Sequence, residues 1–417
     1  MAITRVLNQR GHLTFKGNLK HTRYGWLRLT PAYSVHLVGE ILDQYEVGSG
    51  VVLDPFCGTG TTALVCAERG VHCDTVDINP FLVWLTTAKA RPYTAQDIAS
   101  FQSAVHTVAE VVAQNDAPQF QPPLFQIEKW WEPDTLSALA RMMWRINNLA
   151  QTMQEDSIAL LKVAFCRTMI ELSNVSFGHQ SMSFKASSDL HVTPMLDLLC
   201  GREQRVLDSW TQAATDIAAS ASSEIVQEPR ALLADARSLE AALPHNQYAC
   251  VITSPPYPNR MSYIRELRPY MYWLGYLQDA RSAGELDWQA IGGTWGFATS
   301  SVAKWKPEAD VPIPHRGFME IIERIDERSP ILSRYVHKYF YDMVKHIRGL
   351  FSVVRPGGSI HYIVGNSKFY DVLLPVEEIF ASLFTSQGFE QVHITSIRKR
   401  SSKKELYEFV VSARKPM

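Results

Sequence analysis

The sequence of 417 residues lacks the features that mark membrane, secreted and metal-bound proteins. Its apolar runs are short, far below the ~18 residues that a membrane-spanning helix needs. The first residues contain no apolar stretch of the kind found in a secretory signal peptide. The six cysteines include no C-x-x-C pair, so neither a zinc site nor a disulfide framework is indicated. We therefore expect a cytoplasmic protein with reduced thiols, no membrane contact and no bound metal.

An excess of charge of one sign is also lacking. The chain carries 41 basic and 42 acidic residues, which gives a net charge of −1. A basic field over the whole protein is therefore absent, and any nucleic-acid surface must come from local clustering. The composition is otherwise that of an ordinary globular protein, with 46% hydrophobic residues, which excludes a disordered chain or a fibre. At ~100–200 residues per domain, the length allows two or three domains.

Strand and helix patterns alternate in two parts of the chain. Residues 51–54 are typical of a short buried strand, and a glycine-rich turn follows them. The same rhythm continues with a helix over 61–69, a strand over 72–77 and a helix over 80–90. Strand–helix alternation at this pace predicts a doubly wound α/β sheet. The pattern resumes further on, with strands predicted over 231–235, 248–253, 359–365, 391–397 and 406–413 and helices over 335–350 and 376–387.

Two segments interrupt this pattern. Residues 95–225 are poor in strand signals and carry apolar residues at helical spacing, so we expect a helical insertion. Residues 277–330 have no clear period and are predicted to be irregular. The predicted organisation is an N-terminal segment with the first half of the α/β domain over 1–94, the helical insertion over 95–225, a central part of the α/β domain over 226–276, the irregular insertion over 277–330 and the last part of the α/β domain over 331–417.

The most informative segment is Asp54-Pro55-Phe56-Cys57-Gly58-Thr59-Gly60-Thr61-Thr62, between the first predicted strand and its helix. Its two glycines permit a tight turn and let a ligand approach the backbone closely. The helix N-terminus after the turn favours a negative group such as a carboxylate. At the end of the next strand, Asp77 has the spacing of a carboxylate that binds ribose hydroxyls. The segment predicts a cofactor loop; the alternative is a plain tight turn in a Rossmann-like sheet.

A dinucleotide fits this loop poorly. The G-x-G-x-x-G pattern needs a third glycine, and Ala63 stands in its place. Asp54 would repel a pyrophosphate but would suit a ligand with an ammonium group. An adenosine that carries an amino acid satisfies both Asp54 and Asp77. The loop therefore predicts S-adenosylmethionine as the cofactor.

A second motif, Thr253-Ser254-Pro255-Pro256-Tyr257, directly follows the strongest predicted strand. Two prolines fix the backbone and leave carbonyl groups that no local N–H can satisfy. Ser254 and the Pro255 carbonyl are suited to accept hydrogen bonds from an exocyclic amine, while Tyr257 is suited to stack on a planar base. Such a base must leave its duplex stack to reach the site. The alternative interpretation is an ordinary proline turn.

Together the two motifs resemble those of the amino-methylating DNA methyltransferases, the family that methylates cytosine N4 or adenine N6. The similarity leaves out both insertions but extends to other segments, namely Leu29-Thr30-Pro31, Asp77-Ile78-Asn79-Pro80, Asp235 and Arg355-Pro356-Gly357-Gly358. It implies the Rossmann-like fold of S-adenosylmethionine-dependent methyltransferases, with a doubly wound, seven-stranded mixed sheet.

The resemblance implies roles for individual residues. In the cofactor site, Asp54 would hold the methionine ammonium, and Gly58 and Gly60 would line the methionine. Asp77 would bind the ribose and Asp235 the adenine amino group, although Asp235 also suits the N-cap of a helix after its strand. The remaining cofactor candidates are Pro31, Phe56, Thr61 and Ile78. The implied catalytic residues are Ser254, Pro255, Pro256 and Tyr257.

The implied chemistry needs no covalent intermediate, because the sulfonium methyl is already activated. The enzyme must hold the amine nitrogen in line with it, roughly 3–3.5 Å away. In the family, S-P-P-Y leans towards cytosine N4 and D-P-P-Y towards adenine N6, so Ser254 favours cytosine. Methylation of cytosine C5 would need a cysteine nucleophile, usually after a proline, and the chain has no Pro-Cys pair. We expect Cys57 to be a packing residue.

The expected substrate is double-stranded DNA. Because the motif order leaves no room for a C-terminal recognition domain, we expect the insertions to read the bases. Aromatic and basic residues interleave in 277–330, and the loop 173–185 and the basic tail are suited to phosphates. The candidate DNA contacts are Ser176, His179, Lys185, Trp295, Lys304, Arg316, Arg398 and Arg400. Packing within a solvated loop or strand edge is the alternative for each segment.

The resulting hypothesis is a site-specific cytosine-N4 DNA methyltransferase. The family implies that such an enzyme is the modification half of a restriction–modification system, with a cognate endonuclease as partner. Three alternatives remain open: adenine-N6 methylation, RNA guanine-N2 methylation, and a non-catalytic DNA-binding partner that kept the fold. The RNA enzymes usually carry Asp before Pro-Pro-Tyr and a sizeable N-terminal RNA-binding domain. A degenerate non-catalytic copy would be expected to lose some motif residues, which are intact here.

Overall fold

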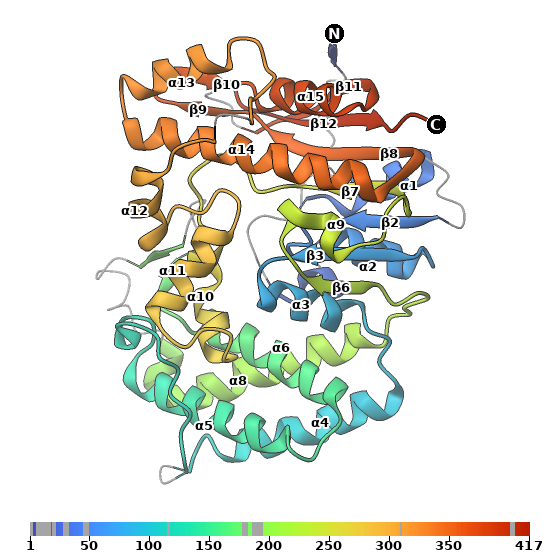
Figure 1. The fold of residues 1–417 in the computed structure, drawn as a ribbon. Coiled ribbons are helices and arrows are strands. Elements are labelled where there is room, and N and C mark those ends of the chain that lie inside the picture. Colours follow the sequence, from blue (N-terminus) through green and yellow to red (C-terminus); the bar gives the residue numbers. More distant parts are fainter. Residues whose placement is uncertain are drawn as a thin grey trace.

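The architecture is an α/β sheet with a block of helices at one end (Figure 1). The computed structural model describes residues 3–5, 18, 22–27, 33–44, 50–114, 117–176, 182–185, 195–308, 311–400 and 405–417. The strands of the main sheet are β1 (Ile3–Arg5), β2 (Val51–Asp54), β3 (Cys73–Asp77), β6 (Arg230–Leu233), β7 (Tyr248–Thr253), β8 (Val354–Gly365), β11 (Glu390–Lys399) and β12 (Tyr407–Arg414).

The strand order across the sheet is β1-β11-β12-β8-β7-β2-β3-β6. Strand β12 is antiparallel to both of its neighbours, and the other pairs are parallel. From β2 the chain winds outward through β3 to β6, and from β7 it winds the other way. This is the doubly wound, mixed sheet of the Rossmann-like methyltransferase fold, as predicted. The prediction of seven strands missed β1, because three residues at the sheet edge carry no readable alternation.

Helices cover both faces of the sheet. On one face α1 and α2 pack over side chains such as Ile252 and Ile363. On the other face α14 and α15 pack over Val251 and Ile360. Neighbouring residues of β7 are therefore buried on opposite faces, as in a strand covered on both sides. The bounds of the helices next to the sheet are α1 (Val35–Gln44), α2 (Thr61–Glu68), α3 (Pro80–Ala90), α9 (Leu239–Ala242), α14 (Pro330–Val353) and α15 (Val376–Gln387).

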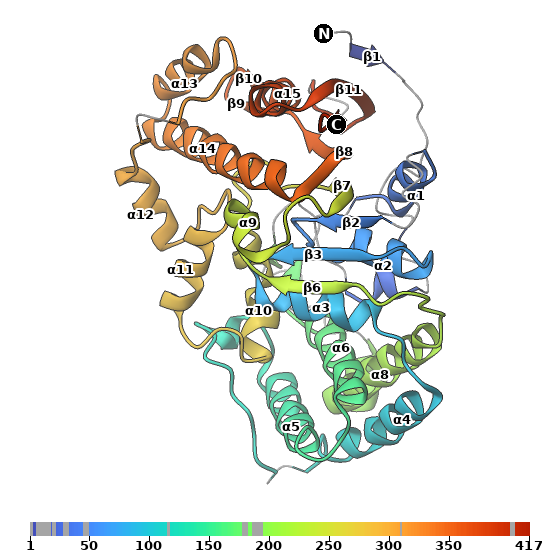
Figure 2. The same cartoon turned by 45° about the vertical axis from the view of Figure 1, so that its right-hand side comes forward.

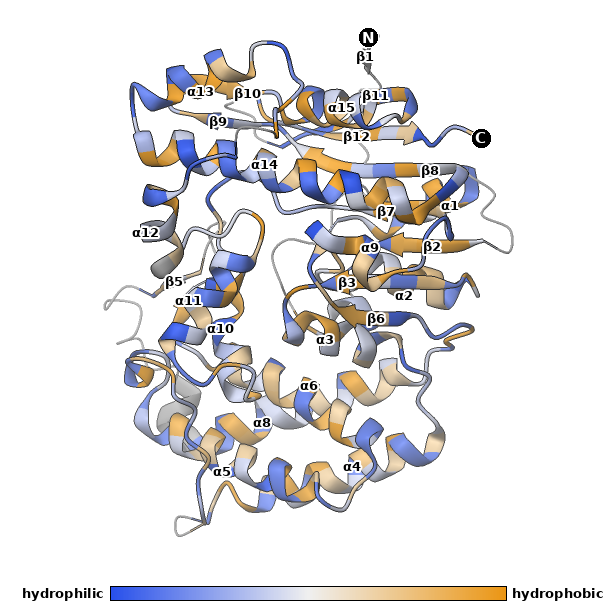
Figure 3. Cartoon of the chain, viewed as in Figure 1, coloured by the Kyte–Doolittle hydropathy of each residue, from blue (hydrophilic) through white to orange (hydrophobic). Residues whose placement is uncertain are grey.

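The predicted helical insertion forms the block below α3 and β6 (Figure 2). It contains α4 (Ala95–Glu110), α5 (Pro133–Leu149), α6 (Glu155–Glu171) and α8 (Met195–Ala221). Its helices carry both hydrophobic and hydrophilic residues, as expected when one side of each helix is buried (Figure 3). Helix α10 (Tyr263–Trp273) joins this block to the α/β body, because its Trp273 packs edge-on against Trp131 and Phe165. A short pair of strands, β4 (Val175–Ser176) and β5 (Ser183–Phe184), lies within the segment predicted as a loop.

The prediction that 277–330 is irregular was wrong. This segment contains α11 (Ala280–Gln289), α12 (Phe297–Lys304) and α13 (Phe318–Asp326). These helices are short, and glycine and proline residues separate them. Each is therefore too short to show a clear apolar periodicity in the sequence. Their stability comes from local caps and burial instead. Asp279 and Ser282 form a capping box on α11, and Ala283 and Val302 are buried.

The smaller elements complete the described chain. They are the 3₁₀ turns η3 (Arg23–Gly25), η4 (Ile127–Lys129) and η5 (Ala236–Ser238) and the hairpin strands β9 (Ser367–Phe369) and β10 (Val372–Leu374). Across the described ranges, no helix is long and apolar enough to cross a membrane. The same residues contain no group of three or more His, Cys, Asp or Glu side chains that could hold a metal ion.

Candidate active site

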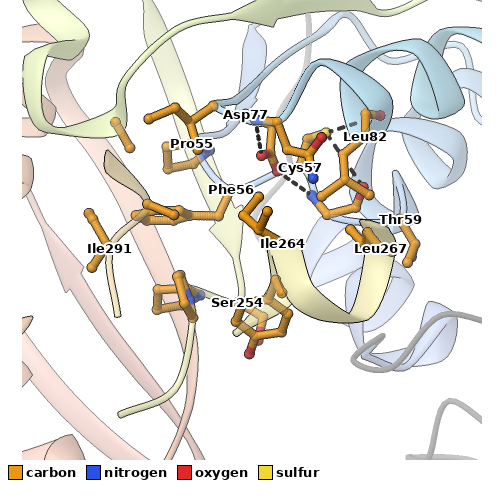
Figure 4. Close-up of a pocket in the computed structure, with 18 of the residues that line it drawn as sticks. Pro55, Phe56, Cys57, Thr59, Asp77, Leu82, Ser254, Ile264, Leu267 and Ile291 are labelled. Carbon is orange, nitrogen blue, oxygen red and sulfur yellow. Dashed lines mark hydrogen bonds between the residues drawn. The ribbon is translucent and has the colours of Figure 1, made fainter. Parts of the chain in front are cut away.

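The two sequence motifs meet at the switch point of the sheet, between β2 and β7. Ligands of doubly wound sheets bind outside the carboxyl ends of the strands at this point. A pocket lies there, with about 1030 Å³ of empty space that includes its open mouth. Its lining residues are Tyr33, Pro55, Phe56, Cys57, Gly58, Thr59, Asp77, Ile78, Asn79, Leu82, Asp235, Ala236, Ser254, Pro255, Pro256, Tyr257, Tyr263, Ile264, Leu267, Gln289, Ala290 and Ile291. Figure 4 shows Ser254 and Asp77 on opposite sides of this space.

Asp54 ties the cofactor loop to the catalytic motif. Its carboxylate accepts hydrogen bonds from the Thr253 hydroxyl at 2.6 Å, the Tyr33 hydroxyl at 3.0 Å and the Phe56 amide at 3.2 Å. The side chain is fully buried and is not among the residues that line the pocket. The predicted contact between Asp54 and a methionine ammonium stays a prediction. The geometry gives Asp54 the role of holding both motifs in register.

Gly58 and Gly60 make the tight turn that the sequence predicted. Both adopt positive φ, at 50° and 77°. A Cβ on Gly60 would lie 2.8 Å from Thr86 Oγ1, so the turn also needs the missing side chain for space. Gly58 lines the pocket, whereas Gly60 and Thr61 lie behind it and begin α2. Of the three predicted cofactor contacts in this turn, only Gly58 reaches the pocket.

Asp77 is fixed by backbone donors at the end of β3. Its carboxylate accepts from the Gly58 amide at 3.1 Å and from the Asn79 amide at 2.9 Å. Burial raises the pKa of Asp77 to about 6, against the lowering effect of these amides. Beside it, the Asn79 side chain caps α3 through its oxygen, and its amide nitrogen is buried with no hydrogen-bond partner. The two side chains offer an acceptor and a donor at one end of the pocket.

Asp235 lines the pocket and also caps a helical turn, as its alternative interpretation predicts, while its contact with the adenine amino group stays a prediction. Its carboxylate accepts from the Arg237 amide at 2.9 Å and from the Arg237 guanidinium at 2.6 Å. The same guanidinium donates to the backbone oxygen of Gln289 at 2.9 Å. This links the end of β6 to the C-terminus of α11. Gln289 and its neighbours thereby form one wall of the pocket.

All four predicted catalytic residues line the pocket. The Pro256 carbonyl accepts a hydrogen bond from the Tyr339 hydroxyl at 2.7 Å, which anchors the motif to α14. Among the described residues, no hydrogen bond uses the Pro255 carbonyl. That carbonyl is therefore the acceptor that the proline turn leaves for a ligand. The Tyr257 backbone oxygen is already engaged by the Asn259 amide at 2.8 Å.

The Tyr257 side chain is held from outside the pocket. Its hydroxyl donates to Glu408 at 3.0 Å, and the Arg400 guanidinium carbon lies 5.1 Å from its ring centroid. Burial, with a contribution from the neighbouring Glu408, keeps the pKa of Tyr257 well above its ordinary value. The phenol is therefore protonated and acts as a hydrogen-bond donor.

The structure separates the predicted DNA contacts into different groups. Lys304 and Arg316 are exposed. Trp295 packs against Arg268, whose guanidinium carbon lies 5.4 Å from its ring, and the Lys185 ammonium is bonded to the Ser173 carbonyl. Arg398 is paired with Glu408, and Arg400 lies over the Tyr257 ring. Their contact with DNA phosphates stays a prediction. Ser176 lies in β4. Pro31 and His179 lie outside the described residues.

Sequence reasoning missed several walls of the pocket. Ile264 and Leu267 of α10 close it from one side (Figure 4). Their helical spacing directly after the catalytic motif, with Ser262 as N-cap, is a signal that was available. Tyr33 and the Gln289–Ile291 wall had no such signal, because they reach the pocket through contacts between distant parts of the chain.

The pocket residues fit S-adenosylmethionine. Asp77 offers a carboxylate with the geometry of the ribose partner, next to the unpartnered Asn79 amide. Phe56, Ile78 and Ile291 supply apolar surface for a planar ring system. The backbone at Gly58 allows close approach of the methionine end.

Comparisons with known proteins agree with this fit. No protein-family model matches the chain. The Type II methyltransferase M.AvaI of Nostoc sp. (strain PCC 7120 / SAG 25.82 / UTEX 2576) is 21% identical over 425 residues, which cover 94% of this chain and 85% of that protein. M.BsoBI of Geobacillus stearothermophilus is 21% identical over 432 residues, covering 93% and 82%. The Type II methyltransferase M.MvaI of Kocuria varians is 18% identical, covering 85% and 78%.

The chain is similar to Type II methyltransferases. The similarity spans most of each protein, including both motifs and both insertions of this chain, and it supports a methyltransferase of this kind. It also implies S-adenosylmethionine as the methyl donor. Among solved structures, the rRNA methyltransferase AviRa of Streptomyces viridochromogenes shares 12% identity at a TM-score of 0.30, an overlap too loose to bear on fold or function.

The buried carboxylate of Asp54 predicts a pH effect on stability. Burial raises the pKa of Asp54 to about 7. Between its ordinary value near 3.9 and about 7, the unfolded chain loses the proton first, so the free energy of unfolding falls as pH rises. We expect Asp54→Asn to remove this contribution, which changes by roughly 3 kcal/mol between pH 5 and pH 8 at ~1.4 kcal/mol per pKa unit, because about two units separate pH 5 from the folded pKa of about 7. Urea unfolding of both proteins at pH 5 and pH 8 checks this. Equal pH dependence in the two proteins would contradict it.

Proposed function

We propose that this protein is a site-specific DNA methyltransferase that transfers a methyl group from S-adenosylmethionine to N4 of a flipped-out cytosine. The observation that carries the proposal is the shared pocket of Asp77 and Ser254-Pro255-Pro256-Tyr257. It joins a ribose-binding carboxylate to an acceptor turn suited to an exocyclic amine. The Type II names of the relatives favour DNA as the substrate and a role as the modification enzyme of a restriction–modification system, with a cognate endonuclease.

The chemistry requires positioning rather than a protein nucleophile. The cofactor, when bound, supplies an activated sulfonium methyl. The Pro255 carbonyl and the Ser254 hydroxyl accept hydrogen bonds from the exocyclic amine and draw its nitrogen towards tetrahedral geometry. They thereby stabilise the positive charge that develops on this nitrogen. The Tyr257 ring stacks on the base and fixes its plane. Ile264 and Leu267 cover the site and exclude water from it.

The target atom follows from the first residue of the catalytic turn. A neutral serine at 254 matches the cytosine-N4 type, as the motif resemblance implies. Adenine-N6 methylation uses the same geometry and is the nearest alternative. An RNA substrate is disfavoured by Ser254 in place of aspartate. A non-catalytic role is disfavoured because the pocket retains both the Asp77 anchor and the Pro255 acceptor.

A transfer assay tests the substrate class. The purified protein is incubated with labelled S-adenosylmethionine in three separate reactions. The first contains unmethylated bacterial DNA, the second methylated DNA from the same source and the third bulk tRNA. We expect label in the unmethylated DNA alone. Label in tRNA would show that the protein is an RNA methyltransferase and would contradict the proposed DNA substrate. Absence of transfer together with absence of S-adenosylmethionine binding would favour the non-catalytic alternative.

A further inference from the structure

Tyr257 is surrounded by a charged frame that the two motifs do not include. Three adjacent strands supply it: Gly365 on β8 pairs with Glu408 on β12, and Glu408 pairs with Arg398 on β11. The three residues therefore lie in one row across the sheet. Because β8 is the neighbour of β7, this row runs directly beside the strand that leads into the catalytic turn.

Glu408 is the centre of the row. It is 8% exposed, and its two oxygens have different partners. One accepts from the Tyr257 hydroxyl at 3.0 Å, and the other accepts from Arg398 Nε at 2.6 Å. A buried carboxylate costs free energy unless it is paired, and Arg398 supplies that pairing. The carboxylate can therefore hold the tyrosine hydroxyl at one fixed point.

Arg400 fixes the ring itself. Its guanidinium lies over the Tyr257 ring and donates to the Asn366 carbonyl at 3.0 Å. Arg400 is not among the pocket-lining residues, whereas Tyr257 is. The guanidinium thus covers the side of the ring turned away from the pocket and leaves the pocket side open. A Cβ on Gly365 would collide with Arg400 Nη1 and lie 3.0 Å from Tyr257 Cε2, so this arrangement needs glycine at 365.

We propose that Glu408 and Arg400 are positioning residues that fix the plane of the Tyr257 ring and, through it, the plane of the stacked target base. The inference rests on the proposed function, in which that ring stacks on the base. Hydrogen bonding at the hydroxyl prevents the ring from tilting, and the guanidinium prevents it from moving away from the pocket. The two contacts act on different parts of one side chain. Their loss affects alignment of the amine more than binding of the cofactor or the DNA.

A double-mutant cycle tests the hydroxyl contact. Tyr257→Phe keeps the ring and removes the donor, and Glu408→Gln keeps the shape and removes the charge. We expect each to lower kcat for methyl transfer roughly tenfold, with KM for DNA and S-adenosylmethionine affinity within about threefold. The double variant should be no less active than the less active single variant, because Tyr257→Phe removes the contact that Glu408→Gln weakens. Multiplying effects would overturn the proposal, since Glu408 would then act independently of Tyr257.

The residue before Arg400, at the end of β11, provides a matched control. Lys399 lies over the Tyr407 ring, with its ammonium 5.9 Å from the centroid, and is one residue away. We expect Arg400→Met to lower kcat and Lys399→Met to leave it unchanged. Thermal unfolding of each variant identifies any variant that fails to fold. If Glu408→Gln fails to fold, the comparison of Arg400→Met with Lys399→Met still tests whether the ring is positioned. Equal kcat in Arg400→Met and the unmodified protein would overturn the part of the proposal that concerns Arg400.

Tyr257→Ala separates this inference from the proposed function. Tyr257→Ala could lose transfer while Tyr257→Phe, Glu408→Gln and Arg400→Met keep the full kcat. The ring would then be needed but its contacts with Glu408 and Arg400 would not, which contradicts the positioning role and leaves the proposed function intact. If Tyr257→Ala keeps full activity, or the unmodified protein transfers nothing to DNA, the stacking role falls and the inference falls with it.

Discussion

Asp77→Ala is expected to weaken binding of S-adenosylmethionine by roughly 30- to 1000-fold, which corresponds to ~2–4 kcal/mol for lost charge-assisted hydrogen bonds. The carboxylate is the predicted ribose partner, and it also holds the amides of Gly58 and Asn79. The substitution therefore removes both a ligand contact and the order of the turn that lines the methionine end. Isothermal titration calorimetry with the cofactor measures the effect directly.

Asp74 provides the control for this substitution. It lies on the same strand β3 and is also buried, but its carboxylate pairs with Arg230 at 2.5 Å and with the Tyr248 hydroxyl at 2.6 Å. It is not among the pocket residues. We expect Asp74→Ala to lower the free energy of unfolding and leave the cofactor Kd of the folded protein within about threefold, because no lost contact faces the ligand. Equal Kd values for Asp77→Ala and the unmodified protein would contradict the ribose assignment.

Tyr257→Ala is expected to lower kcat for methyl transfer by roughly 100- to 1000-fold. Stacking on a base contributes ~1–3 kcal/mol, and a misaligned amine adds further loss. Binding of S-adenosylmethionine should change little, because the cofactor contacts come from the loop after β2 and from Asp77. Single-turnover transfer to unmethylated DNA, with calorimetry on the same preparation, separates the two quantities. If Tyr257→Ala keeps the transfer rate of the unmodified protein, Tyr257 does not stack on the target base.

The sequence was informative about the centre of the fold because local signals define it. The glycine turn, the proline turn and Asp77 each follow a strand, and parallel strands bring their carboxyl ends to one edge. Those three features therefore predict both the doubly wound sheet and the pocket. The bounds of α3 and α15 also match the prediction, since local residues define their ends: Asn79 and Pro80 begin α3, and Gly388 follows the last turn of α15.

The remaining parts of the site depend on contacts between distant residues. The hydrogen bond between Thr253 and Asp54 is an example. The two residues are 199 positions apart, so no local pattern reveals that this carboxylate joins the two motifs. Arg398 and Arg400 show the same limit. Their charges indicate a basic tail suited to phosphates. The pairing of β11 with β12 brings Glu408 to Arg398, and Arg400 lies over the ring of Tyr257, which follows β7.

The identity of the methylated nucleoside shows which atom of DNA receives the methyl group. Unmethylated bacterial DNA is incubated with the protein and labelled S-adenosylmethionine, digested to nucleosides and analysed by mass spectrometry. We expect labelled N4-methylcytosine, formed at a rate lower by roughly 100- to 1000-fold with Tyr257→Ala. Labelled N6-methyladenine would keep the mechanism but show that Ser254 does not set the base. Label on cytosine C5, or no label in DNA, would contradict transfer to an exocyclic amine at the Ser254–Tyr257 turn.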